Sequence, residues 1–181
     1  MKKFNLAFPG LLVAGWFAVL ATGALAQHQN SQHSSYSGFE GRSIKALSDS
    51  QIADLRAGRG MGLALAAELN GYPGPLHALE LADKLMLSTE QRERIQSLTL
   101  TMQRETIVIG DEVIAAEAVL DGLFAQKKAD PASLANATKA VSEAQGQLRE
   151  AHLRYHLHTQ AALTPEQIED YARLRGYASR P

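Results

Sequence analysis

The chain has 181 residues, a formal net charge of −1 and no cysteine. Its length allows one domain with a substantial core. Without cysteine, disulfides, thiolate metal sites and cysteine nucleophiles are excluded. The sequence has no basic block that could follow a phosphate backbone, so nucleic acid is not expected as a partner.

The N-terminus has the pattern of a secretory signal peptide. Lys2 and Lys3 precede a mostly apolar stretch, residues 11–25, which ends in small residues at Ala26. The stretch is weaker than the roughly 20 strongly apolar residues of a bilayer-spanning helix. We therefore expect residues 1–26 to be cleaved, leaving no membrane span; an uncleaved anchor is the alternative. Export of a cysteine-free chain is compatible with a bacterial periplasm.

The next segment, residues 27–46, is rich in Ser, Gln, His and Gly and has no apolar period. Such a composition predicts a flexible leader outside the core. We interpret His28 and His33 within it as solvated side chains rather than metal ligands. A helical domain is expected over residues 47–177, followed by a short tail at 178–181.

A helix-capping motif occurs three times, at Leu47–Gln51, Leu87–Gln91 and Leu163–Gln167. In each copy a Ser or Thr can accept a hydrogen bond from a free backbone N–H. The Gln three residues later can bond back to the cap residue. Each copy therefore predicts the start of a helix.

From Leu47 onward, apolar residues recur three and four positions apart, and no stretch shows convincing strand-like alternation. This periodicity predicts an all-α domain. Asp130 is the expected N-cap before Pro131, so residues 127–130 are the predicted turn of a hairpin. Helices are expected at residues 48–70 (loosened around 58–60), 75–86, 88–126, 131–162 and 165–175.

The two long predicted helices carry matching stripes. In an antiparallel hairpin, residues that face each other have residue numbers with a constant sum. Nine positions of the first helix pair in this way with nine positions of the second. This match predicts a long antiparallel hairpin with knobs-into-holes packing. The paired positions are Ile95, Leu98, Met102, Glu105, Ile109, Val113, Ala116, Leu120 and Leu123 with Ala162, Thr159, Tyr155, His152, Leu148, Ala144, Val141, Ala137 and Leu134.

One pair in this seam is ionisable, because Glu105 falls opposite His152. His156 follows His152 by one helical turn, and Met102 lies one turn from Glu105. Two imidazoles and a carboxylate would suit Zn²⁺, Ni²⁺ or Co²⁺, with water or a thioether completing the shell. The alternative is a Glu105–His152 ion pair that sets the helix register and binds nothing.

His77 is a further candidate ligand, although a surface position near Glu80 is the simpler expectation. No phosphate-binding loop, nucleophile elbow or His-Glu-x-x-His helix is present. We therefore expect no enzymatic activity, no catalytic residue and no required cofactor. The segment Met61–Leu69 is apolar on nearly all sides, which predicts cover from a third layer, a dimer interface or apolar clients.

The motifs at Leu87–Gln91 and Leu163–Gln167, on an exported, helical and cysteine-free chain, resemble the Leu-Thr-x-x-Gln motifs of the Spy/CpxP superfamily. The resemblance implies a periplasmic stress protein with a long helical hairpin, often dimerised into a curved cradle. One branch contains ATP-independent chaperones that hold unfolded envelope proteins. The other, similar to CnrX and ZraP, binds Zn²⁺, Ni²⁺ or Co²⁺, and either buffers the metal or reports it to a membrane-bound regulator.

CnrX-like sensors use a Glu on one long helix and a His followed four residues later by a Met. Glu105 and His152 match two of these roles, whereas His156 stands in place of the Met. Sensors also carry a His pair ahead of the first motif, where this chain has only His77. The resemblance therefore favours the chaperone branch, with a metal sensor or buffer as the alternative.

Overall fold

Side-chain caps begin the main helices in residues 36–177, the part of the chain that the computed structural model describes. Ser48, Ser88 and Thr164 each accept from the backbone N–H of a Gln, and that Gln bonds back to the cap. All three predicted capping boxes are thus confirmed. They begin α1 (Asp49–Arg56), α4 (Thr89–Ala125) and α6 (Pro165–Leu174).

Three predicted segments lie outside the described residues. They are the signal peptide at residues 1–26, the first part of the leader at 27–35, and the tail at 178–181. Within residues 36–177 no helix is both long enough and apolar enough to cross a membrane.

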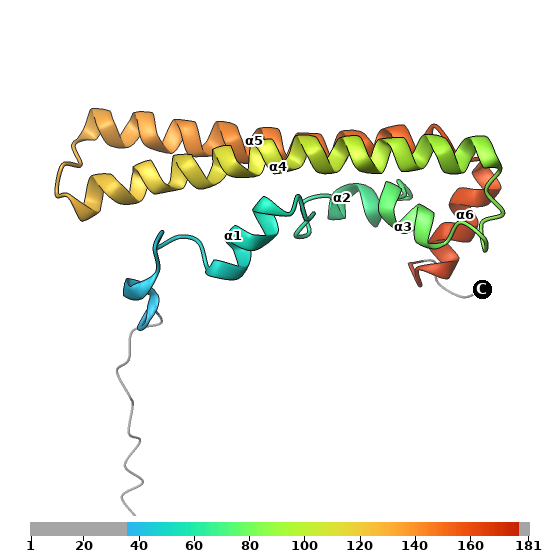
Figure 1. The fold of residues 1–181 in the computed structure, drawn as a ribbon, viewed down its shortest axis with the longest axis horizontal. Coiled ribbons are helices and arrows are strands. Elements are labelled where there is room, and N and C mark those ends of the chain that lie inside the picture. Colours follow the sequence, from blue (N-terminus) through green and yellow to red (C-terminus); the bar gives the residue numbers. More distant parts are fainter. Residues whose placement is uncertain (1–35, 178–181) are drawn as a thin grey trace, which may run out of the picture. The chain divides into compact units, whose positions relative to one another are not determined.

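Two long helices, α4 and α5 (Pro131–Gln160), pack against each other and dominate the fold (Figure 1). Their connection lies where it was predicted. Asp130 caps α5 by accepting from the N–H groups of Ala132 and Ser133. The other described elements are helices as well, with no strand among them, so the all-α prediction is confirmed for this part of the chain.

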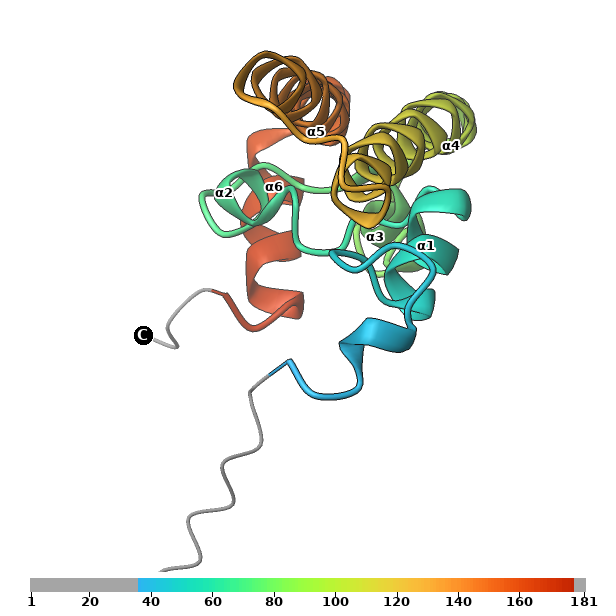
Figure 2. The same ribbon diagram turned by 90° about the vertical axis from the view of Figure 1, so that its left-hand side faces the viewer.

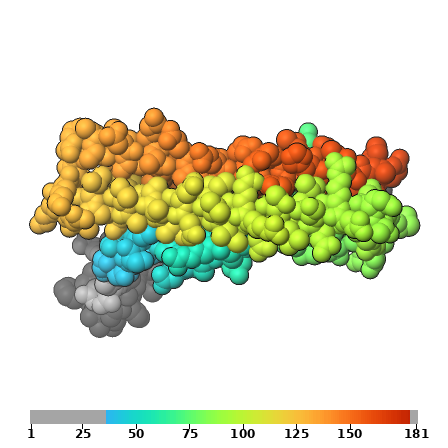
Figure 3. Space-filling model, turned by 45° about the horizontal axis from the view of Figure 1, so that its top comes forward, coloured from blue at the N-terminus to red at the C-terminus, as the bar shows by residue number. Residues whose placement is uncertain are grey.

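Much of the predicted stripe on α5 is buried. Ala137, Val141, Ala144, Leu148 and Tyr155 are all buried, whereas Leu134 near the turn is exposed. On α4 the buried positions include Thr106 and Gly110, which the pairing did not select. The reason is that α1 packs on α4 as well, so α4 is covered along a second face (Figures 2 and 3).

The contact between α1 and α4 depends on two glycines. A Cβ at Gly110 would lie 2.6 Å from the carbonyl oxygen of Leu55, and one at Gly58 would lie 2.7 Å from Oγ1 of Thr106. Neither distance is tolerated by a side chain.

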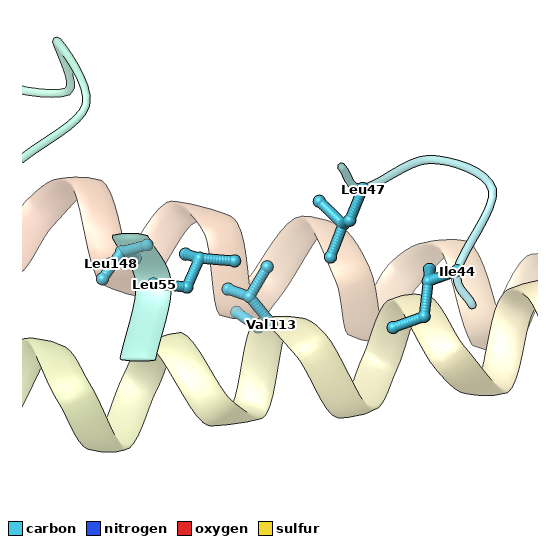
Figure 4. Packing of buried hydrophobic residues seen from close by; sticks show 6 residues of the cluster. Ile44, Leu47, Leu55, Val113 and Leu148 are labelled. Atoms are coloured by element: carbon cyan, nitrogen blue, oxygen red, sulfur yellow. The ribbon is translucent and has the colours of Figure 1, made fainter. Parts of the chain in front are cut away.

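The N-terminal core cluster includes a residue of the predicted leader. Ile44 and Leu47 pack with Leu55, Val113 and Leu148 (Figure 4), and Ile44 is 7% exposed. The prediction that residues 27–46 stay outside the core is therefore wrong for Ile44. A branched aliphatic side chain near an open helix face gains roughly 1.5–3 kcal/mol from burial, which outweighs the polar character of its neighbours.

The predicted helix over residues 48–70 is broken. It ends at Arg56, and only a short helix, α2 (Leu65–Glu68), follows. Between them Gly58, Met61 and Gly62 all have positive φ, at 66°, 43° and 78°. A right-handed helix cannot continue through such residues. The next helix, α3 (Pro75–Glu80), begins as predicted but ends six residues early.

A second core joins α3, α4 and α6, around Leu85, Ile95 and Tyr171. At its edge the glutamines of two capping motifs meet: Gln91 Nε2 lies 2.8 Å from Gln167 Oε1, and Gln167 Nε2 lies 3.0 Å from Gln91 Oε1. The motifs therefore do more than begin helices, because they also tie the start of α4 to the start of α6.

Candidate functional site

A pocket of about 660 Å³ opens beside the two long helices, where the loop after α1, α2 and the start of α3 approach them. Its walls are mainly apolar, and Met61, Leu65, Leu76 and Met102 contribute to them. Three imidazoles also line the pocket, those of His77, His152 and His156. Four of the five residues considered as metal ligands thus lie around one pocket.

His152 is the least satisfied polar side chain in this pocket. It is 3% exposed, and its Nε2 has no hydrogen-bond partner among the described residues. Burial lowers the pKa of its imidazole, and the nearby His156 lowers it further. The ring is therefore neutral near pH 7, with one nitrogen as donor and the other as acceptor.

His156, one turn later on α5, is held in a fixed orientation. Its Nδ1 lies 2.7 Å from the carbonyl oxygen of Tyr72, and since a carbonyl can only accept, Nδ1 carries the proton. The same Nδ1 lies 3.6 Å from Oε2 of Glu68.

Glu68 connects the short helices to α5 and to the C-terminal segment. This carboxylate is 7% exposed and accepts hydrogen bonds from the Tyr171 and Tyr177 hydroxyls and from the Gly74 N–H. Arg175 Nε lies 3.6 Å from its Oε1. Burial and the hydrogen bond to Glu68 raise the pKa of Tyr171. The negative charge of Glu68 is thus compensated inside the protein.

His77 lies at the edge of this network, with its side chain 39% exposed, and its acidic neighbour is Glu68 rather than Glu80. Its Nδ1 lies 3.5 Å from Oε1 of Glu68. The expected neighbour was the acidic residue one turn away on the same helix. Glu68 takes its place because the break after α1 turns α2 towards α3 and α5.

Glu105 is placed apart from the imidazoles. Its carboxylate accepts from Arg154 Nη2 at 2.6 Å and from the Tyr155 hydroxyl at 2.7 Å. These two hydrogen bonds hold the pKa of Glu105 below its usual value. The expected Glu105–His152 ion pair is not formed, because charged and hydroxyl donors two and three residues farther along α5 satisfy the carboxylate, while His152 is kept neutral by burial.

Within residues 36–177 no group of three His, Asp or Glu side chains is arranged to hold a metal ion. The imidazoles of His152 and His156, with the thioether of Met102, share a pocket, but Glu105 does not line it. A metal ion bound here would draw on the pocket residues and water rather than on Glu105.

No protein-family model matches the chain, and no match was found among curated proteins or among solved structures. The resemblance to the Spy/CpxP superfamily therefore rests on the capping motifs and the signal-like N-terminus alone.

Sequence reasoning did not single out Glu68. The signal was present, since Glu68 is the one acidic residue in the apolar segment 61–69. A carboxylate in such a segment is expected to need buried partners. Gly74 and His77 lie nearby in sequence, but the other partners come from α5, α6 and the residues after α6, and nothing in the local sequence indicates that these meet Glu68.

Proposed function

We propose that this protein is a periplasmic, ATP-independent chaperone-like protein of the Spy/CpxP type, acting in envelope stress. It holds apolar segments of unfolded envelope proteins, and its two long helices form a hairpin that dimerises into a cradle. The observation that carries the proposal is a patch of half-exposed apolar side chains beside the pocket. The patch consists of Met61, Leu65, Leu69 and Leu76, which are 42%, 55%, 56% and 50% exposed.

The composition of this patch favours binding of unfolded segments. Large apolar side chains gathered on a surface indicate an interaction site. Three of the four, Met61, Leu65 and Leu76, also line the pocket, so the patch continues into a concave surface. Arg59 and Arg175 border the same pocket and add charged groups to the apolar surface.

An aggregation assay tests this proposal. The mature chain, with metal removed by EDTA, is added to a chemically denatured test protein during dilution, and light scattering is followed. We expect suppression of scattering, weakened several-fold in a Leu65→Ser, Leu69→Ser double variant. Leu100→Ser, Val108→Ser is the control, since both residues are exposed on α4. No suppression by the unmodified chain, or equal loss in the control, would refute the proposal.

A second candidate is a Zn²⁺, Ni²⁺ or Co²⁺ sensor or buffer that reports to a membrane-bound regulator. It is favoured by the two imidazoles of His152 and His156 one turn apart, with His156 oriented by the Tyr72 carbonyl as metal-bound histidines commonly are. Calorimetric titration of the three ions tests it. Binding that is lost in His152→Ala and kept in His158→Ala, an exposed control, would support the metal candidate. A Glu105→Gln variant shows whether that carboxylate takes part.

A further inference from the structure

We propose that Met61 is a redox-sensitive site, at which oxidation of the thioether to a sulfoxide by a peroxide weakens the binding of unfolded segments. This inference rests on the proposed chaperone function and adds a means of regulating the same surface. Met61 lies in the turn between α1 and α2 and belongs to the apolar patch that it forms with Leu65, Leu69 and Leu76.

The backbone at Met61 is unusual for a residue of its size. Gly60 and Leu63 close a tight turn, in which the Leu63 N–H donates to the Gly60 carbonyl at 2.7 Å. Both central residues have positive φ, 43° at Met61 and 78° at Gly62. Glycine, asparagine and aspartate are the usual residues in such positions, because a larger side chain crowds its own backbone. The turn thus carries a long apolar side chain where the backbone favours a short one.

Met61 also contributes to two separate hollows of the described surface. It lines the pocket that contains His152, and it lines a second pocket of about 450 Å³, beside Leu55 of α1 and Leu148 of α5. The residue is 42% exposed, so a small reagent in water can reach it. A change in the polarity of this one side chain therefore alters two apolar surfaces at once.

The reactive atom is the thioether sulfur. The chain has no cysteine, and methionine is then the side chain that a peroxide oxidises most readily. With hydrogen peroxide, the sulfur bonds one oxygen as the O–O bond breaks, and the proton of that oxygen passes to the departing hydroxide to give water. The sulfur loses two electrons, which the peroxide gains. The product is a polar sulfoxide in place of an apolar thioether.

Comparison with the other methionines of the described region shows why Met61 is the sensitive one. Met86 is 80% exposed but lines neither of the two pockets, and Met102 is half-buried on α4. The other three members of the patch are leucines, which a peroxide leaves unchanged. Met61 is therefore the member of the patch whose polarity an oxidant changes, and methionine oxidation disrupts apolar contact surfaces.

The test treats the metal-free mature chain with hydrogen peroxide and follows each sulfoxide by peptide mapping and mass spectrometry. We expect Met61 and Met86 to be oxidised before Met102. Suppression of aggregation should fall several-fold as Met61 is oxidised, and it should return after treatment with methionine sulfoxide reductases, which restore the thioether. Oxidation of Met102 before Met61, or full suppression by chain that is oxidised at Met61, overturns the inference.

Two variants assign the effect to one sulfur atom. Met61→Leu keeps an apolar side chain and removes the sulfur, so its suppression, whatever its starting level, should be the same before and after peroxide. Met86→Leu is the matched control, because it removes the most exposed thioether and should still lose suppression on oxidation. A loss in Met61→Leu equal to that of the unmodified chain would overturn the site.

Failure of this inference can be told apart from failure of the proposed function. If the untreated chain suppresses aggregation and oxidation of Met61 changes nothing, the inference fails and the proposed function stands. If the untreated chain suppresses nothing, the proposed function fails, and the inference fails with it.

Discussion

Three of the buried ionisable side chains in the described region, Glu68, Glu117 and His152, differ in how their polar atoms are satisfied. Glu68 has several donors, and Glu117 has one from Gln145 at 3.2 Å. Nε2 of His152 has none. Burial and the nearby Asp121 raise the pKa of Glu117, while burial lowers that of His152. Both shifts oppose the charged form, which makes these residues costly to ionise in the folded state.

The pH dependence of stability should show the contribution of His152 to the free energy of unfolding. Its pKa in the folded protein is below the ordinary value of 6.5, so below pH 6.5 the unfolded chain binds a proton that the folded chain does not. Stability contributed by His152 is therefore lost as the pH falls from 6.5 towards the lowered pKa. Thermal melts across this range should show a smaller decrease in Tm for His152→Phe than for the unmodified chain. His158→Phe, at an exposed position, should not change the decrease.

Gly110 is predicted to be intolerant of even one methyl group. An added Cβ would meet the Leu55 carbonyl at 2.6 Å, so α1 must move away from α4. We expect Gly110→Ala to lower the free energy of unfolding by about 1–3 kcal/mol. Gly146→Ala, where the built Cβ meets nothing within 4 Å on α5, should instead raise it by about 0.5–1 kcal/mol. Urea denaturation of both variants measures the contrast, and equal effects would contradict it.

At the scale of elements, the capping motifs act in pairs. Gln91 uses Oε1 to accept from the Ser88 N–H, while its Nε2 donates to Gln167 and to the Ala162 carbonyl. Gln167 mirrors this pattern through the Thr164 N–H and the Leu85 carbonyl. The two side-chain amides thus link the N-terminus of α4 to the N-terminus of α6.

Loss of one amide should destabilise both helix starts. Gln91→Leu leaves the Ser88 N–H and the Ala162 carbonyl without this partner, so we expect a loss of about 1–3 kcal/mol in the free energy of unfolding. Gln96→Leu is the matched control, because Gln96 is exposed on the same helix. Denaturant titration measures both variants. A Gln91 variant as stable as the control would mean that the amide pair adds nothing beyond the Ser88 cap.

At the scale of the whole described domain, Glu68 is where distant parts of the chain meet. Through this one carboxylate, α2 contacts His77 on α3, His156 on α5 and Tyr171 on α6. The pocket and the C-terminal helix share this connection. A molecule in the pocket would therefore lie beside the same carboxylate that holds α6 through Tyr171.

Glu68→Gln should loosen the C-terminal helix. The amide keeps an acceptor but loses the charge that faces Arg175, so we expect faster amide hydrogen exchange in α6 and a loss of about 1–3 kcal/mol of stability. Glu80→Gln, at an exposed position on α3, should change neither. Unchanged exchange in α6 of the Glu68 variant would show that the helix is held by its apolar contacts alone.

The sequence by itself determined the features that depend on nearby residues. The three capping boxes, the turn before Pro131 and the all-α class follow from hydrogen bonds and apolar spacing within a few positions. The burial of Val113 and Leu148 was predictable in the same way, because a periodic stripe on a long helix needs a partner.

Only the tertiary structure decided what the polar residues of the core contact. Glu105 meets Arg154 and Tyr155 instead of His152, and Glu68 gathers partners that are up to 109 positions away in sequence. Helical periodicity indicates which face is buried, but a shift of two residues between helices changes which side chains meet. The partner that a long polar side chain then bonds depends on its length and on the strength of the donors within reach. The local spacing of residues along the sequence determines neither.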